Sequence, residues 1–161
     1  MKAWYDFATD ADWFDSPILK TTPKNIENIL DSKIKHLWKQ YNDEDNDIKK
    51  YECCIQIISK NPKHYFAYLR AGDTLRKLKE NDVANEKYLE SIRLSDGKCI
   101  EVLNNYGNFQ SHLKKHEEAI VWYDKGLAIA PDDVVLLLNK GSALENLGKH
   151  EEAIVWYDKA L

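Results

Sequence analysis

Apolar residues recur at helical spacing over the first third of the chain. One predicted helical face carries Ile26, Ile29, Leu30, Ile34, Leu37, Trp38 and Tyr41, and a second stripe carries Ile48, Tyr51, Ile55 and Ile58. Residues three and four positions apart share one face of an α-helix. Thr22 followed by Pro23 suits the N-cap and first turn of the first helix. The pattern therefore predicts an amphipathic helical hairpin over residues 23–60.

Two segments in the second half of the chain are nearly identical. Residues 116–127 read HEEAIVWYDKGL, and residues 150–161 read HEEAIVWYDKAL. They lie 34 residues apart and differ only at Gly126 and Ala160. Self-similarity at a fixed period of this length is the sequence signature of a repeat architecture. The chain is therefore expected to be built from stacked repeat units.

Small and aromatic residues keep the same period. The recurring positions are Gly72, Gly107 and Gly141, then Ala84, Ala119 and Ala153, then Tyr88, Tyr123 and Tyr157. We expect the glycine of one helix and the alanine of the next to let two antiparallel helices approach closely. The tyrosine, one turn after the alanine, fills the gap beside them. Pro131 closes the unit that begins near Ile100, because proline follows a helix that has already ended.

This arrangement resembles the tetratricopeptide repeat. The family pattern has large residues early in the first helix, Gly or Ala at position 8, Ala at 20, an aromatic at 24 and Pro at 32. Residues 100–133 carry the matching Leu103, Tyr106, Gly107, Ala119, Tyr123 and Pro131. The resemblance implies an all-α fold, a right-handed superhelix (α-solenoid) of antiparallel helix-turn-helix hairpins.

The resemblance also divides the chain. The predicted segments are an acidic-aromatic N-terminal arm over 1–22, a divergent helical hairpin over 23–64, repeats over 65–99 and 100–133, and a repeat over 134–161 that is truncated in its second helix. Asp96 stands where the proline of the repeat over 65–99 is expected. Trp38 and Lys50 occupy the two small-residue positions of the divergent hairpin, so close helix packing is not expected there.

By the same resemblance, the first helix of each repeat lines a concave groove through its positions 2, 5, 6, 9, 12 and 13. The predicted partner-binding residues of this groove are Arg70, Asn104, Asn105, Asn108, Asn139 and Ser142. An asparagine side chain offers both a donor and an acceptor, so it can pair with a peptide unit of an extended ligand. Asn105 and Asn139 both occupy position 6 and resemble the asparagine ladder of some family members. The alternative is that these side chains only face water.

The sequence does not match a second peptide-binding arrangement of the family, the carboxylate clamp. It needs Lys and Asn at positions 5 and 9 of one repeat, Asn at 6 of the next, and Lys and Arg at 2 and 6 of the third. Only Lys35 fits when the clamp starts at residue 31, and only Asn105 fits when it starts at residue 65. A set of cations either favours an acidic ligand or is simply solvated: Lys35, Lys39, Arg70, Arg76 and Lys77.

Composition excludes several other classes of protein. The formal net charge of −4 argues against nucleic acid as the main partner, because phosphate binding needs a basic surface. Three cysteines (Cys53, Cys54 and Cys99) are too few for a disulfide framework or a zinc site and are interpreted as small core residues. The N-terminus lacks the features of a signal peptide, and nowhere do 18 apolar residues run together. A cytoplasmic protein without membrane contact is expected.

No catalytic or cofactor site is predicted. Asp43, Asp45 and Asp47 have the spacing of calcium-loop ligands, but Ile48 replaces the turn glycine and Cys54 the closing glutamate, so a solvated acidic turn is expected. The five histidines lack metal-site spacing, and neither a phosphate loop nor a nucleophile elbow is present. We therefore expect a protein that is not an enzyme and binds neither cofactor nor metal.

Three functions remain open. The first is a scaffold that binds a peptide or partner protein in the groove. The second is a structural or self-association module, because a repeat truncated in its second helix leaves Leu137, Leu144, Ala153 and Trp156 less covered and favours homo-oligomers. The third is the targeting part of a longer regulatory or enzymatic protein. The acidic-aromatic arm either packs on the chain's own helices or meets a partner.

Overall fold

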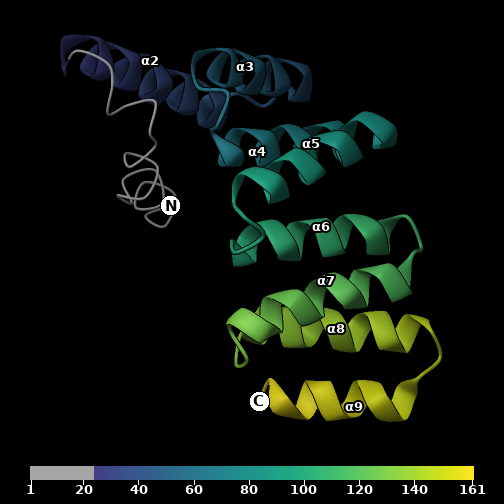
Figure 1. Cartoon of the computed structure of the whole chain (residues 1–161). Coiled ribbons are helices and arrows are strands. Elements are labelled where there is room, and N and C mark those ends of the chain that lie inside the picture. The colour runs from purple at the N-terminus through teal and green to yellow at the C-terminus, as the bar shows by residue number, and fades with distance from the viewer. Residues whose placement is uncertain (1–23) are drawn as a thin grey trace. The chain divides into compact units, whose positions relative to one another are not determined.

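The computed structural model describes residues 24–161 (Figure 1). This part of the chain folds into eight α-helices and contains no strand. Their bounds are α2 Lys24–Asp43, α3 Asp47–Lys60, α4 Tyr65–Lys77, α5 Asn81–Leu94, α6 Ile100–His112, α7 His116–Ile129, α8 Val134–Asn146 and α9 His150–Lys159. The fold is the expected all-α solenoid. The predicted arm over 1–22 and the helix start at Thr22 and Pro23 lie outside the described residues.

The chain divides into two units, residues 1–64 and residues 65–161. In the first unit, α2 packs against α3 and buries Ile34 and Leu37. Asn46 begins α3, because its Oδ1 accepts hydrogen bonds from the backbone N–H groups of Ile48 (2.9 Å) and Lys49 (3.1 Å). The acidic segment between the two helices is therefore a capped turn.

The apolar stripe predicted for α3 is wrong in part. Ile48 is 58% exposed and Ile55 is 38% exposed, whereas the buried residues of this helix are Cys53, Cys54 and Ile57. Cys53 and Ile57 lie one turn apart with Cys54 beside them, so they form a second apolar stripe that faces inward instead. The interpretation of these two cysteines as small core residues is confirmed.

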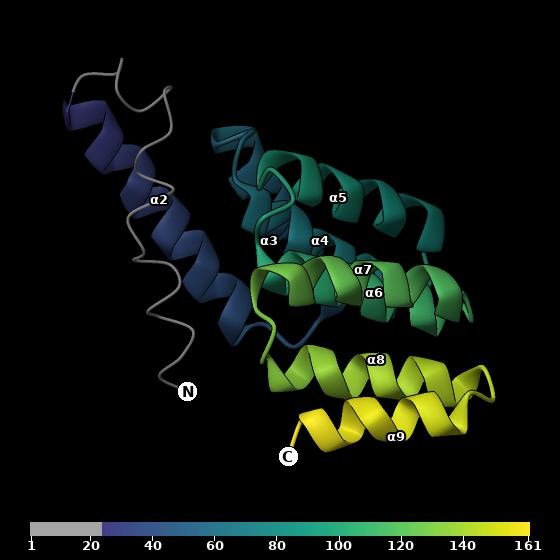
Figure 2. The ribbon, with the colours of Figure 1, turned by 60° about the horizontal axis from the view of Figure 1, so that its bottom comes forward.

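In the second unit, three antiparallel hairpins (α4–α5, α6–α7 and α8–α9) follow one another in chain order (Figures 1 and 2). Each helix packs against its hairpin partner, and α5 and α7 also contact the first helix of the next hairpin. The hairpin turns use left-handed backbone at Lys79 (φ 64°), Lys114 (φ 64°) and Gly148 (φ 76°). This conformation lets the chain leave one helix and enter the next within a few residues.

The close approach predicted at the repeated glycines is confirmed. A Cβ placed on Gly107 would lie 2.5 Å from Cε1 of Tyr123, and one on Gly141 would lie 2.5 Å from Cε1 of Tyr157. At Gly72 the corresponding distance to the ring of Tyr88 is 3.1 Å. Each tyrosine ring therefore occupies the space that a side chain at the glycine would need.

The prediction that core residues of the last hairpin are less covered is wrong for three of the four named residues. Leu137, Leu144 and Ala153 are 2–3% exposed, because α8 packs against both α7 and α9. Exposed apolar groups of this hairpin lie at other positions, on α9 at Ile154 among others. Ile154 is 56% exposed, whereas Ile120, its counterpart on α7, is half-buried and packs against the core of α7 and α8.

Candidate functional site

The first helices of the three hairpins present one surface, which we call the A-helix face. It comprises positions 2, 5, 6, 9, 12 and 13 of α4, α6 and α8, and α6 contacts both of the other two helices. All six predicted partner-binding residues belong to it. Arg70 is only 8% exposed, whereas Asn108 and Ser142 are exposed. Asn104, Asn105 and Asn139 are half-buried.

Arg70 links α4 to α6 through ion pairs. Its guanidinium donates to Oδ2 of Asp73 (2.8 Å) and to Oε1 of Glu101 on the next hairpin (2.5 Å), and it stacks on the ring of Phe66 at 4.6 Å. Nδ2 of Asn105 also donates to Oδ2 of Asp73, at 3.4 Å. Because the guanidinium is buried between two carboxylates, its charge is neutralised within the chain.

A second link joins α6 to α8. Nδ2 of Asn139 donates to Oδ1 of Asn104 at 2.8 Å, across two hairpins. The spacing of asparagines in the sequence pointed to these residues, but it gave no sign that they bond to each other. With the bonds of Arg70 and Asn105, the A-helix face therefore has one hydrogen-bonded link between α4 and α6 and a separate one between α6 and α8.

Each hairpin also sends a tyrosine hydroxyl to this face. The hydroxyl of Tyr88 donates to Oδ1 of Asp73 at 2.7 Å, and that of Tyr123 donates to Oδ1 of Asn108 at 2.8 Å. Burial raises the pKa of Tyr123 to about 12, and it also raises the pKa of Tyr88, with the nearby charge of Asp73 as the second cause. The tyrosines were predicted to fill the gap beside two closely packed helices, and their hydroxyl contacts were missed.

Apolar and charged groups complete the A-helix face. On α8, Val135 is 54% exposed and Leu138 is 44% exposed, beside Asn139 and Ser142. Three cations and three anions lie at the positions that define the face, so its formal charge is zero: Arg70, Arg76, Lys77, Asp73, Glu101 and Glu145. This balance does not favour the acidic ligand that the cations alone suggested.

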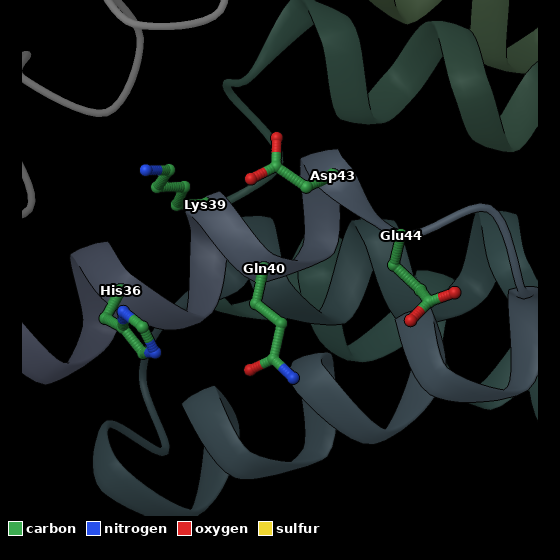
Figure 3. Close-up of a pocket in the computed structure, with 5 residues that line it drawn as sticks. All are labelled: His36, Lys39, Gln40, Asp43 and Glu44. Atoms are coloured by element: carbon green, nitrogen blue, oxygen red, sulfur yellow. The ribbon is translucent and has the colours of Figure 1, made fainter.

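A shallow hollow of about 310 Å³ lies along α2 in the first unit. Figure 3 shows the five polar side chains that line it, His36, Lys39, Gln40, Asp43 and Glu44. The backbone N–H of Asn46 lowers the pKa of Glu44, whose carboxylate also pairs with Lys49 at 3.6 Å. Since none of these five side chains is apolar, the hollow offers little to bury an organic ligand.

Two general features of the described residues bear on the class of protein. Within residues 24–161, no helix is long and apolar enough to cross a membrane. In the same part of the chain, His, Cys, Asp and Glu side chains do not gather in groups of three or more that could hold a metal ion. The fold and the A-helix face thus define an all-α solenoid whose A-helix face is polar and has no net formal charge.

Comparison with known proteins identifies the family. Two family models, each described as tetratricopeptide repeat, match residues 100–133 and 122–155. Residues 100–155 of this chain are tetratricopeptide repeats, and the resemblance inferred from the glycines, alanines and tyrosines is confirmed. A search of curated proteins finds no match.

Several solved structures share the fold. A crystal structure of MamA protein is 22% identical, with a TM-score of 0.71 over 86% of this chain and 74% of that chain. PilW, titled a widely conserved type IV pilus biogenesis factor, is 24% identical, with a TM-score of 0.72 over 83% of this chain and 61% of its own. PilF of Pseudomonas aeruginosa is 22% identical, with a TM-score of 0.73 over 86% and 62%. At these identities the likeness establishes the fold alone.

Proposed function

We propose that this chain is a non-enzymatic scaffold whose A-helix face binds an extended segment of a partner protein. The observation that carries the proposal is that side-chain amides of neighbouring hairpins gather on this face, where Asn104 bonds to Asn139 and Asn105 bonds to Asp73. Protein interaction is also the role that tetratricopeptide repeats support.

The chemistry of the A-helix face favours an uncharged ligand. Amides donate and accept hydrogen bonds at once, as the main chain of an extended peptide requires. The exposed Val135 and Leu138 add an apolar contact beside the amides, of the kind that gives a polar interface its affinity. Arg70 contributes by holding Asp73 and Glu101 in place, and its predicted direct contact with a partner stays a prediction.

The test uses peptides selected on the chain from a display library of 12-residue sequences. Replacing Asn105 and Asn139 by Ala is expected to raise the Kd of the selected peptide about tenfold or more, because each lost hydrogen bond weakens binding by about 1 kcal/mol. The matched control replaces Glu118 and Glu152 by Ala. These two exposed residues are repeat equivalents on α7 and α9, so their loss should leave the Kd unchanged.

Circular dichroism of both double variants shows whether the helices are retained. Selection of no peptide, or an unchanged Kd for the asparagine double variant with intact helices, refutes the A-helix face as the binding site. A cytoplasmic location and attachment to a longer regulatory or enzymatic protein stay predictions of the sequence.

We also propose, as a second function, self-association through α9. Ile154 is 56% exposed and Tyr157 half-buried, although the equivalent Ile120 is half-buried and Tyr123 is 1% exposed. An apolar helix face of this kind is stabilised by a second copy of the chain. Sedimentation velocity over a range of concentrations should show a dimer that Ile154→Lys disrupts. A strict monomer at high concentration would exclude this function.

A further inference from the structure

The tyrosine of each hairpin decides which atoms of the A-helix face remain available to a partner. Tyr88 donates its hydroxyl hydrogen to Asp73, Tyr123 to Asn108, and Tyr157 to Oε2 of Glu145 at 2.9 Å. The acceptors in the first and third hairpins are carboxylates, which only accept hydrogen bonds when ionised. The tyrosine hydroxyl is therefore the donor in those two hairpins.

If the tyrosine of the middle hairpin also donates, the orientation of the Asn108 side-chain amide is fixed. If Tyr123 donates, the atom that it meets is the carbonyl oxygen Oδ1, at 2.8 Å. The amide nitrogen Nδ2 is then the end of Asn108 that is left for a ligand, and this residue is exposed. Asn108 thus presents two N–H donors, while one lone pair of its Oδ1 is already used by Tyr123.

The orientation of the Asn104 side-chain amide is fixed in the same way by a different residue, Asn139. Its Oδ1 accepts a hydrogen bond from Nδ2 of Asn139 at 2.8 Å, so its own Nδ2 is left with two N–H donors. Asn104 and Asn108 lie four residues apart on α6, on one face, with Cβ atoms about 6 Å apart. The two amide nitrogens therefore lie one helical turn apart, and the Oδ1 atom of each side chain already accepts a hydrogen bond.

We propose that Asn104 and Asn108 form a paired donor site that binds two main-chain carbonyl oxygens of the partner, and that Tyr123 and Asn139 are the positioning residues that orient it. This inference rests on the proposed function, since it assigns the hydrogen-bonding direction of that same face. In an extended chain, carbonyls on one side recur every second residue, about 6.6 Å apart. That spacing suits two donors one helical turn apart.

The charges nearby decide between a carbonyl and a carboxylate as the ligand. Asp73 and Glu101 share the guanidinium of Arg70, and the positive charge of Arg76 acts on the Tyr88 hydroxyl that bonds to Asp73, so these four formal charges cancel. The face offers no excess positive charge to attract a carboxylate, whereas a carbonyl oxygen needs none. The partner segment is therefore neutral where it meets Asn104 and Asn108.

The first experiment needs no ligand. In ¹H–¹⁵N spectra of the side-chain amides, Tyr123→Phe should lower the order parameter of the Asn108 amide and leave that of Asn104 unchanged. Asn139→Ala should do the reverse. A purely structural role for the tyrosine would leave the mobility of the Asn108 amide unaltered, and that result would overturn the assignment of Tyr123.

The second experiment measures the Kd of the display-selected peptide, synthesised without acidic residues and with an amidated C-terminus. Asn104→Asp and Asn108→Asp keep the oxygen that accepts from Asn139 or Tyr123 but remove the free N–H donors. Each should raise the Kd at least tenfold, and Tyr123→Phe should raise it by a smaller factor. The matched control is Asn85→Asp, because Asn85 on α5 likewise accepts from a tyrosine hydroxyl, that of Tyr106 at 2.8 Å.

The outcomes separate this inference from the proposed function. If Asn105→Ala with Asn139→Ala abolishes binding but Asn104→Asp and Asn108→Asp do not, the donor pair is wrong and the binding face stands. If none of these variants alters the Kd, both are wrong. Binding that requires a free carboxylate on the peptide would overturn the carbonyl assignment.

Discussion

Replacing Gly107 by Ala tests the packing that defines each hairpin. The new Cβ would lie 2.5 Å from Cε1, 2.8 Å from Cδ1 and 3.1 Å from Cζ of Tyr123. Tyr123 is 1% exposed, and its hydroxyl is bonded to Asn108, so the ring has no free space to enter. Either the two helices must separate or the tyrosine must leave its position.

Two opposing effects set the magnitude. Alanine is a better helix former than glycine and should stabilise α6 by about 1 kcal/mol. Forcing an extra methyl group into a packed core costs about 1–3 kcal/mol, and displacing the hydroxyl from Asn108 costs about 1 kcal/mol more. The free energy of unfolding of the Gly107→Ala variant should therefore fall by about 2 kcal/mol.

Urea unfolding followed by circular dichroism at 222 nm measures this change. The matched control is Gly141→Ala, where the added Cβ also lies 2.5 Å from a tyrosine ring, that of Tyr157. Tyr157 is half-buried and can turn outward, so this variant should be close to neutral. Equal stability of the two variants, or a Gly107→Ala chain at least as stable as the original, would refute the reasoning.

Three further predictions concern charge and pH. Arg70→Ala should lower the free energy of unfolding by about 2–3 kcal/mol, because it removes the positive charge between two partly buried carboxylates, whereas Arg93→Ala, at an exposed ion pair, should leave the midpoint of the same urea titration nearly unchanged. The pKa of Tyr123 is raised to about 12, so its contribution to stability, up to about 3 kcal/mol, should be lost as the pH rises from about 10 to 12. Tyr123→Phe should make the fall less steep, and the raised pKa of Tyr88 accounts for part of what remains. Burial lowers the pKa of His64 to about 4, so the unfolded chain binds a proton first and stability should fall as the pH drops from about 6.5 to 4; thermal melts of His64→Gln should lack this slope.

The repeat unit could be predicted from the sequence because it is local. Gly107, Ala119 and Tyr123 belong to one hairpin, and the contact between glycine and tyrosine follows from their spacing on two adjacent helices. The family comparisons over residues 100–155 agree with that prediction. Where the pattern was ambiguous, prediction failed: α3 carries two apolar stripes, and its sequence does not say that Cys53 and Ile57, rather than Ile48 and Ile55, face inward.

The candidate site was predictable as a set of residues but not as a set of available atoms. Position within the repeat places Asn104, Asn108 and Asn139 on one face. Which end of each amide remains free depends on Tyr123 and on contacts between residues more than 30 positions apart. The burial of Arg70 depends likewise on Glu101 of the next hairpin.

The sequence by itself determined that this chain is an array of helical hairpins, because a period of 34 residues with glycine, alanine and tyrosine at fixed offsets leaves antiparallel helix pairs as the close-packed solution. Only the tertiary structure decided which hydrogen-bond donors and acceptors of the A-helix face remain available. Hydrogen-bond direction is set by the nearest partner in space, and stacking brings Asn139 to Asn104 and Glu101 to Arg70. Periodicity specifies neither contact, because the residues that meet between hairpins occupy different positions of the repeat.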